Sequence, residues 1–267
     1  MSVLDLGCGE WLLLEKILQL HVDGHLQATC SYVGIDFPHG RQDRWSDLST
    51  RCETCFPTVE DLHFDLLQDE GLVEALQRRK PFDLIVLANV LHELPPQRGL
   101  RLFELLFPHL TENGKIIIID PDFDWCFSRE AWTRKSEWNL EDIPVEWEAD
   151  AVWLSRQAIS EVLRAMGFQA TVHPYPRLNM VLWAAQGGRR SGADATRTAD
   201  GRNALKGHLA VQVSDERKRI ARLRRELCEQ FRKSSGLSGE LLVKTIEFFA
   251  ACASQCRRLE AMEELGP

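Results

Sequence analysis

Two glycines separated by one residue stand near the start of the chain, between a short apolar run and a helical pattern. The run covers residues 2–6, and Gly7 and Gly9 follow it. A strand that turns into a helix through glycines brings bare backbone N–H groups close to a ligand, although such turns also occur in α/β proteins without one. Asp5, within the run, adds a carboxylate that can accept hydrogen bonds. The stretch therefore indicates a candidate ligand-binding turn.

Further polar residues follow other predicted strands. Asp36 ends a short apolar strand over residues 30–36, and Asp65 ends one over residues 62–66. In doubly wound folds an acid at the end of the second strand is placed to bind a ribose hydroxyl. The continuous apolar run over residues 82–88 is typical of a strand buried on both faces of a parallel sheet, and Asn89 and His92 come directly after it.

The remaining segments predict the frame that positions these residues. Helical patterns cover residues 12–22, 71–79, 96–110 and 155–166, and strands are predicted over 115–120, 169–174 and 179–185. Residues 37–57 are polar and irregular. Alternation of strands and helices favours a parallel sheet with crossover helices, and the short final connection favours an antiparallel pair. We therefore expect an α/β, doubly wound, mostly parallel seven-stranded sheet with an antiparallel last strand.

Composition narrows the class of protein. The chain has 267 residues, enough for one large domain or a domain with an appendage. It has no apolar run of roughly 20 residues and no secretion signal, so a cytoplasmic protein without a membrane partner is expected. The eight cysteines form only two close pairs, Cys52 with Cys55 and Cys252 with Cys256. Their spacing suggests unpaired thiols and no metal site.

Charge separates the chain into two parts. Residues 1–186 carry 16 Lys and Arg against 29 Asp and Glu, a net −13, whereas residues 187–267 carry 16 against 11, a net +5. The acidic part is a poor match for a nucleic acid backbone, which disfavours a nucleic acid partner. Contact between the basic part and an anionic surface stays open.

The C-terminal part is predicted as a flexible linker over residues 187–207 and a helical segment over residues 208–267. The linker is built almost entirely of small and polar residues. Two helical stripes follow, and the second has the alternating three- and four-residue steps of a coiled-coil or hairpin seam. The first consists of Ile220, Leu223, Leu227 and Phe231, and the second of Leu242, Thr245, Phe249, Cys252, Cys256 and Leu259. We expect these helices to dock on the main domain, on each other, or on a second copy in a homodimer.

In their order along the chain, these motifs resemble the class I S-adenosylmethionine-dependent methyltransferases, a Rossmann-like family, over residues 1 to about 186. The segments that carry the resemblance are residues 3–9, 33–36, 65–66, 82–92 and 110–115. A dinucleotide-binding dehydrogenase would need a third glycine, but Leu12 stands at that position. The sequence of the fourth motif, from Asn89 to His92, is not the Asn-Pro-Pro-Tyr type expected of an enzyme that methylates amino groups of nucleic acids.

The resemblance implies S-adenosyl-L-methionine as cofactor and a small molecule as substrate. It assigns Asp5 to the ammonium of the cofactor and the backbone at Gly7 and Gly9 to its carboxylate. Asp36 is assigned to the ribose, and Asp65 to the adenine amine. Asn89 belongs to the fourth motif and is expected among the cofactor-binding residues. His92 is expected to be the catalytic base if the nucleophile is a hydroxyl; the alternative is that it caps a helix or packs under the loop.

Two departures from the family pattern favour another class of protein. Trp11 replaces a glycine that the family usually has, and its large side chain is expected to crowd the cofactor. The chain also begins almost at the first strand, whereas relatives often have an upstream helix that covers the cofactor. Either the start is truncated, or the cover is expected to come from elsewhere, such as the C-terminal helices. The alternative hypothesis is therefore a catalytically inactive scaffold that recruits a partner. Five tryptophans among acids over residues 121–153 predict either an aromatic pocket for a cationic substrate or a small core.

Overall fold

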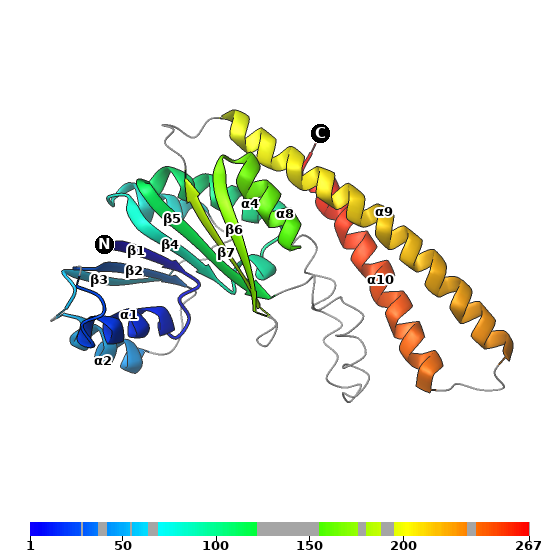
Figure 1. Ribbon diagram of the computed structural model, residues 1–267, viewed down its shortest axis with the longest axis horizontal. Helices are drawn as coiled ribbons and strands as arrows, with labels where there is room; N and C mark the ends of the chain where they lie inside the picture. The colour runs from blue at the N-terminus through cyan, green and yellow to red at the C-terminus, as the bar shows by residue number, and fades with distance from the viewer. Residues whose placement is uncertain are drawn as a thin grey trace.

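Seven strands form one sheet in the order β3-β2-β1-β4-β5-β7-β6 (Figure 1). The computed structural model describes residues 1–27, 29–36, 42–53, 55–63, 69–121, 155–175, 180–187, 195–233 and 239–266. The strands are β1 (Ser2–Leu6), β2 (Ser31–Asp36), β3 (Thr58–His63), β4 (Phe82–Ala88), β5 (Leu110–Pro121), β6 (Phe168–Tyr175) and β7 (Met180–Gly187). The first five strands are parallel, and β7 runs antiparallel between β5 and β6. This architecture confirms the predicted fold class.

Helices cover both faces of this sheet. They are α1 (Leu12–Val22), α2 (Gln42–Cys52), α3 (Asp69–Gln77), α4 (Pro96–Leu106), α8 (Arg156–Ala165), α9 (Ala195–Lys233) and α10 (Gly239–Glu264), with two 3₁₀ turns, η1 (Leu91–Glu93) and η2 (Phe107–His109). Alternation along β1 separates two cores, because successive side chains of a strand point to opposite faces. Val3 packs with residues of α1 and α2, whereas Leu4 and Leu6 pack with residues of α3, α4 and α8.

The start of α8 follows from a local sequence signal. The Ser155 hydroxyl accepts a hydrogen bond from the Ala158 backbone N–H at 3.0 Å, as an N-cap residue does. Gly167, which follows the helix, has a φ of 90° that favours glycine. The predicted helix over residues 155–166 is thus confirmed, and its buried face includes Ile159 and Val162.

Three predicted elements differ from the structure. The third strand is Thr58–His63 instead of residues 62–66, and α2 occupies part of the stretch predicted as irregular. Strand β3 lies at the sheet edge and its side chains are only partly buried, so it lacks the apolar run that marks an inner strand. The fifth strand begins at Leu110, ahead of the predicted start at residue 115, with an irregular register opposite Phe82 and Leu84.

The segment predicted as a flexible linker is helical from Ala195 onward, so that prediction is wrong for residues 195–207. This part of α9 packs on the domain because Leu205 and Leu209 are fully buried in the core beside α4 and α8. Gly201 permits the close approach, since a Cβ at this position would lie 2.8 Å from Met166 Cγ. These two apolar side chains, one helical turn apart, anchor this part of the helix in the core.

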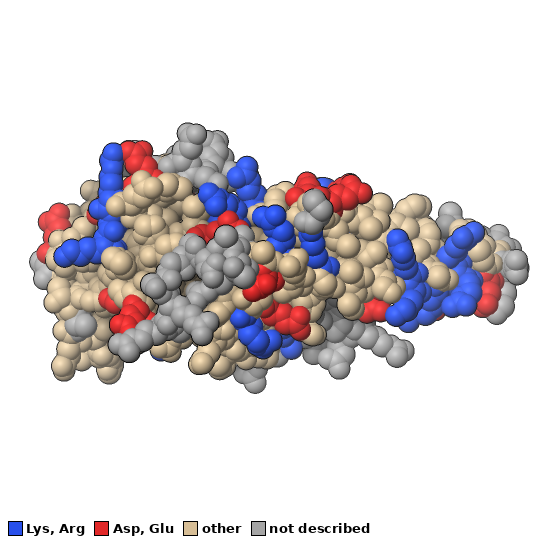
Figure 2. Space-filling view, turned by 90° about the horizontal axis from the view of Figure 1, so that it is seen from above, with Lys and Arg blue, Asp and Glu red and all other residues tan. Residues whose placement is uncertain are grey.

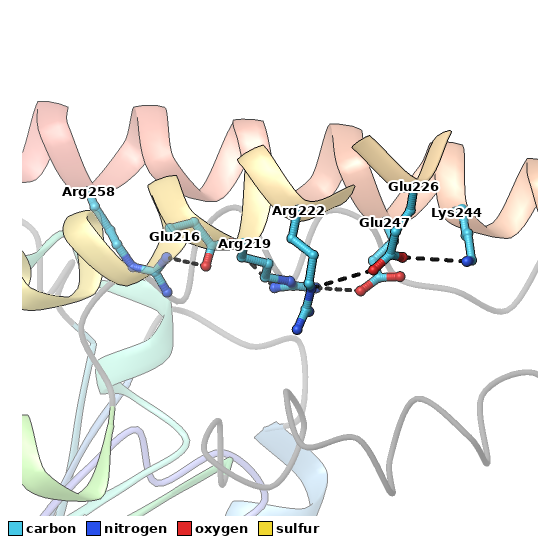
Figure 3. Close-up of polar contacts among 7 residues, drawn as sticks. All are labelled: Glu216, Arg219, Arg222, Glu226, Lys244, Glu247 and Arg258. Carbon is cyan, nitrogen blue, oxygen red and sulfur yellow. Dashed lines mark hydrogen bonds and ion pairs between the residues drawn. The ribbon is translucent and has the colours of Figure 1, made fainter. Parts of the chain in front are cut away.

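Helices α9 and α10 form a hairpin that extends away from the sheet (Figure 1). Ion pairs join them: Arg258 with Glu216 at 3.7 Å, Arg219 with Glu247 at 3.4 Å and Lys244 with Glu226 at 3.4 Å (Figure 3). These pairs cross from one helix to the other at three successive levels. They therefore fix the antiparallel register of the hairpin.

The two predicted apolar stripes differ in burial within this hairpin. Leu223 and Leu227 of α9 are buried, as expected of a seam, but Phe231 is 58% exposed. The predicted stripe of α10 lies outside the seam, with Phe249 65% exposed. The buried residues of α10 are mainly small, namely Ala250, Ala251, Ser254 and Ala261. Small side chains let two helices approach closely, which a search for large apolar residues overlooks.

Candidate active site

The glycine turn after β1 packs directly against the end of β4. Gly7 has a φ of 71°, and a Cβ at this position would lie 2.4 Å from Val90 Cγ2. Only glycine fits there, for both reasons. Its N–H donates to the Ile35 carbonyl at 2.8 Å, which ties the turn to β2 as well. The turn is therefore held between the carboxyl ends of β2 and β4, where ligands of open α/β sheets bind.

Asp36, at the end of β2, points to this turn. Its carboxylate accepts a hydrogen bond from the Gly9 backbone N–H. The two predicted cofactor-binding residues therefore lie in contact, although they are 27 positions apart. Asp65 falls outside the described residues, and so does the tryptophan-rich stretch over residues 122–154.

Asp5 is one residue removed from the turn but points into the core. It is 2% exposed, and the Tyr32 hydroxyl donates to its carboxylate at 2.6 Å. Burial raises the pKa of Asp5 to about 7, and the nearby charge of Asp36 adds to this increase, while the Tyr32 hydrogen bond opposes it. The predicted contact with a ligand ammonium stays a prediction, because here the partner of Asp5 is a buried phenol.

Trp11 occupies a backbone conformation normally reserved for glycine, with a φ of 56°. Its indole is 2% exposed and packs among the residues under α1 and α2, with its ring centroid 5.2 Å from that of Trp45. The indole N–H donates to Asp61 Oδ1 at 3.1 Å. The side chain therefore belongs to this core, which accounts for a tryptophan at a glycine position without placing it across the turn.

Cys8, between the two glycines, has no features of a nucleophile. Its side chain is buried, and its Sγ lies 3.9 Å from Asp61 Oδ1. Burial raises the pKa of the thiol well above its usual value, and the charges of Asp5, Asp61 and Asp36 raise it further. A thiol that stays protonated is a poor nucleophile.

The second half of the site lies where β4 ends. Asn89 takes a left-handed conformation with a φ of 58°, which asparagine tolerates better than most residues. Its N–H donates to the Ile119 carbonyl of β5 at 2.8 Å. This sharp exit from β4 leads into η1, which carries His92.

His92 is oriented by a buried carboxylate. His92 Nδ1 lies 2.6 Å from Asp120 Oδ1, with the His92 side chain 23% exposed and that of Asp120 fully buried. Asp120 also accepts the backbone N–H of Leu91 at 3.1 Å. A histidine paired in this way has one ring nitrogen fixed, and proton acceptance falls to the other, Nε2.

Sequence reasoning placed His92 in the site but did not include Asp120. The signal was present, since a single acid ends the apolar run Ile116–Ile119 of the strand beside β4. To assign this acid to the site, one must know that β4 and β5 are neighbouring strands. Because β4 and β5 are parallel neighbours, their carboxyl ends bring His92 and Asp120 together.

A family model described as a methyltransferase domain matches residues 1–173 of the chain. The chain thus belongs to the class I S-adenosylmethionine-dependent methyltransferase family. No curated protein matches its sequence significantly.

Among the described helices, none combines the length and apolar character that a membrane crossing requires.

Solved structures resemble the fold at low sequence identity. An O-methyltransferase family protein from Burkholderia thailandensis is 15% identical, with 71% of this chain and 52% of that chain covered and a TM-score of 0.47. The 1,6-didemethyltoxoflavin-N1-methyltransferase of the same organism is 15% identical, with 70% and 71% covered and a TM-score of 0.45. Human N-acetylserotonin methyltransferase is 16% identical, with 70% and 48% covered and a TM-score of 0.43. The chain spans about half the length of the first and third of these proteins.

Proposed function

We propose that the chain binds S-adenosyl-L-methionine at the glycine turn and transfers its methyl group to a hydroxyl of a small molecule. The observation that carries the proposal is the His92–Asp120 pair beside this turn. A hydroxyl must lose a proton as it is methylated, and a positioned imidazole is suited to accept it. When bound, the cofactor supplies an electrophilic methyl group on a sulfonium.

The residues of the turn fit the polar groups of such a cofactor. Gly9 has no side chain of its own to cover its N–H, and Asp36 offers a carboxylate to ribose hydroxyls. Asp36 and the Gly9 N–H now bond each other. Opening this bond would release an Asp36 oxygen for a ribose hydroxyl and the Gly9 N–H for the carboxylate of the ligand. Asp36 and Gly9 would thus exchange one internal hydrogen bond for two bonds to the ligand.

Within this proposal the residues of the chain have separate tasks. The fixed end of β4 holds His92 beside the turn, so that the acceptor hydroxyl and the methyl group can be aligned. Nε2 of His92 takes the hydroxyl proton, and Asp120 stabilises the imidazolium that results. Asn89 shapes the exit from β4 that makes this placement possible.

The test measures binding and chemistry separately. Calorimetric titration of the purified chain should detect binding of S-adenosylmethionine, and a panel of phenolic and aliphatic alcohols should include an acceptor that yields S-adenosylhomocysteine. Binding without turnover on any acceptor would refute the assignment of the reaction. Absence of binding at millimolar cofactor would refute the whole proposal and favour the scaffold alternative.

Asp36→Ala is expected to weaken cofactor binding by about 1.5–3 kcal/mol, the value of a hydrogen bond to a charged group. The matched control is Asp83→Ala. Asp83 bonds Ser2 and Thr111 at the opposite ends of the strands, so its loss should leave the affinity unchanged. Titration calorimetry measures both variants. Equal affinities for the Asp36 variant and the unmodified chain would contradict the ribose assignment.

A further inference from the structure

The outer face of α10 carries an apolar stripe that α9 does not cover. It consists of Thr245, Phe249, Cys252, Cys256 and Leu259, and we refer to it as the outer stripe. Phe249 is 65% exposed and Cys256 is exposed, while the other three are half-buried. Within the described part of the chain, α10 packs mainly on α9 and also meets α4. Phe249 is therefore left exposed on the surface of the hairpin, within a row of smaller or half-buried side chains.

The spacing of the outer stripe is that of a helix–helix seam. Its members follow one another at steps of four, three, four and three residues, the period of 3.5 that keeps side chains facing a partner helix. The inner face of α10 has a second series with the same steps, from Glu247 through Ala251 and Ser254 to Ala261, and α9 covers it. A helix with two such seams is suited to lie between two other helices.

The central part of the outer stripe is also uncharged. Residues 248–256 contain no Asp, Glu, Lys or Arg. The solvent-facing side of a helix normally carries charged and polar residues. A partner on this face therefore has to be a neutral, apolar helix surface, and α10 itself presents one.

We propose that the outer stripe is the contact surface of a homodimer in which α10 packs antiparallel against α10 of a second copy. With the two-fold axis between positions 250 and 251, Phe249 lies opposite Cys252 of the second copy, and Thr245 lies opposite Cys256. Each pair occurs twice by symmetry, and the axis falls near the middle of α10. The large phenyl ring is then matched by a small thiol, which allows dense packing.

Charge selects the antiparallel arrangement. Residues 217–233, on the part of α9 farthest from the sheet, carry eight Lys and Arg against two Asp and Glu. Figure 2 shows blue side chains gathered on this part of the hairpin. Antiparallel pairing brings this basic end towards the domain of the second copy, and residues 1–186 have a net charge of −13. Parallel pairing would instead bring the two basic ends together, which like charges oppose.

Light scattering after size exclusion tests the dimer on the full chain at about 50 µM. We expect the unmodified chain at twice the chain mass and Phe249→Glu at the single chain mass. The matched control is Phe231→Glu, which places the same charge at a similarly exposed position of α9, 58% exposed, and should remain dimeric. Circular dichroism establishes that each variant is folded. A monomeric unmodified chain, or a dimeric Phe249→Glu, overturns the proposal.

Cross-linking with a short bismaleimide tests the register. Thr245→Cys is expected to gain an efficient link to Cys256 of the second copy, and adding Cys256→Ser should remove that link. Each variant also carries Cys228→Ser, because Cys228 is another exposed thiol. A parallel pairing would instead link Cys256 to Cys256 in the chain without Thr245→Cys, whereas the antiparallel register holds these two thiols about 16 Å apart along the helices. A Cys256–Cys256 link, with no link between Thr245→Cys and Cys256, overturns the antiparallel arrangement.

Discussion

His92→Ala is expected to lower the rate of methyl transfer by about 10²–10⁴-fold, the usual contribution of a positioned general base. Affinity for S-adenosylmethionine should change by less than about threefold, because His92 is not among the residues expected to hold the cofactor. Single-turnover formation of S-adenosylhomocysteine measures the rate, and calorimetry measures the affinity. A rate within about threefold of the unmodified chain would show that His92 merely packs under the loop.

Asp120→Asn tests the contribution of the residue that orients His92 separately from that of His92 itself. The amide keeps an oxygen that can accept the Leu91 N–H, but it cannot stabilise an imidazolium with a full negative charge. The rate should therefore fall with little change in cofactor affinity. Because the two residues act as a unit, the double variant His92→Ala, Asp120→Asn should be no slower than His92→Ala alone. Additive losses would mean that Asp120 acts independently of His92.

The parts of the site that the sequence predicted are those set by local backbone chemistry. The glycine turn follows from the residue type that adopts a positive φ without strain, as Gly7 and Gly9 do, and its neighbour Asp36 comes at the end of an apolar strand. The run over residues 82–88 predicted β4 at its observed bounds, because a buried parallel strand has no polar side to obscure it. The order of these motifs was enough to identify the family.

The parts that could not be predicted depend on contacts between distant segments. Asp120 becomes part of the site only through the pairing of β4 with β5. Trp11 suggested a crowded cofactor site, whereas the contact with Asp61 of β3 places its indole in the core. The inner face of α10 is built from small residues, so the pattern of larger apolar residues predicted a seam on the opposite face of the helix. In each case the sequence alone did not show which distant segment packs against the residue.

The second large effect concerns Asp5 and the pH dependence of stability. The pKa of Asp5 is raised from 3.8 to about 7 in the folded chain, chiefly by burial. Between these two values the folded chain binds a proton that the unfolded chain has lost, so the free energy of unfolding falls as pH rises. The stabilisation is complete below about pH 4 and is lost above about pH 7. A difference of three pKa units corresponds to about 4 kcal/mol.

Asp5→Asn removes this titration while keeping the shape of the protonated carboxyl and an acceptor for the Tyr32 hydroxyl. The variant should gain about 4 kcal/mol relative to the unmodified chain between pH 4 and pH 8. Urea unfolding of both proteins across this range measures the difference, in which the titrations of all other groups cancel. A constant difference would mean that Asp5 ionises at its ordinary pKa despite its burial.

Two further variants fix the physical origin of this effect. Tyr32→Phe removes the hydrogen bond that favours the ionised carboxylate, so the pKa of Asp5 should rise further and the loss of stability should extend above pH 7. Asp83→Asn serves as the contrast. Hydrogen bonds from Ser2 lower the pKa of Asp83, so its contribution is present at neutral pH and is lost as pH falls through the lowered pKa. The stability differences of the Asp5 and Asp83 variants from the unmodified chain must therefore change in opposite directions with pH, and parallel changes would rule out burial as the cause of the Asp5 shift.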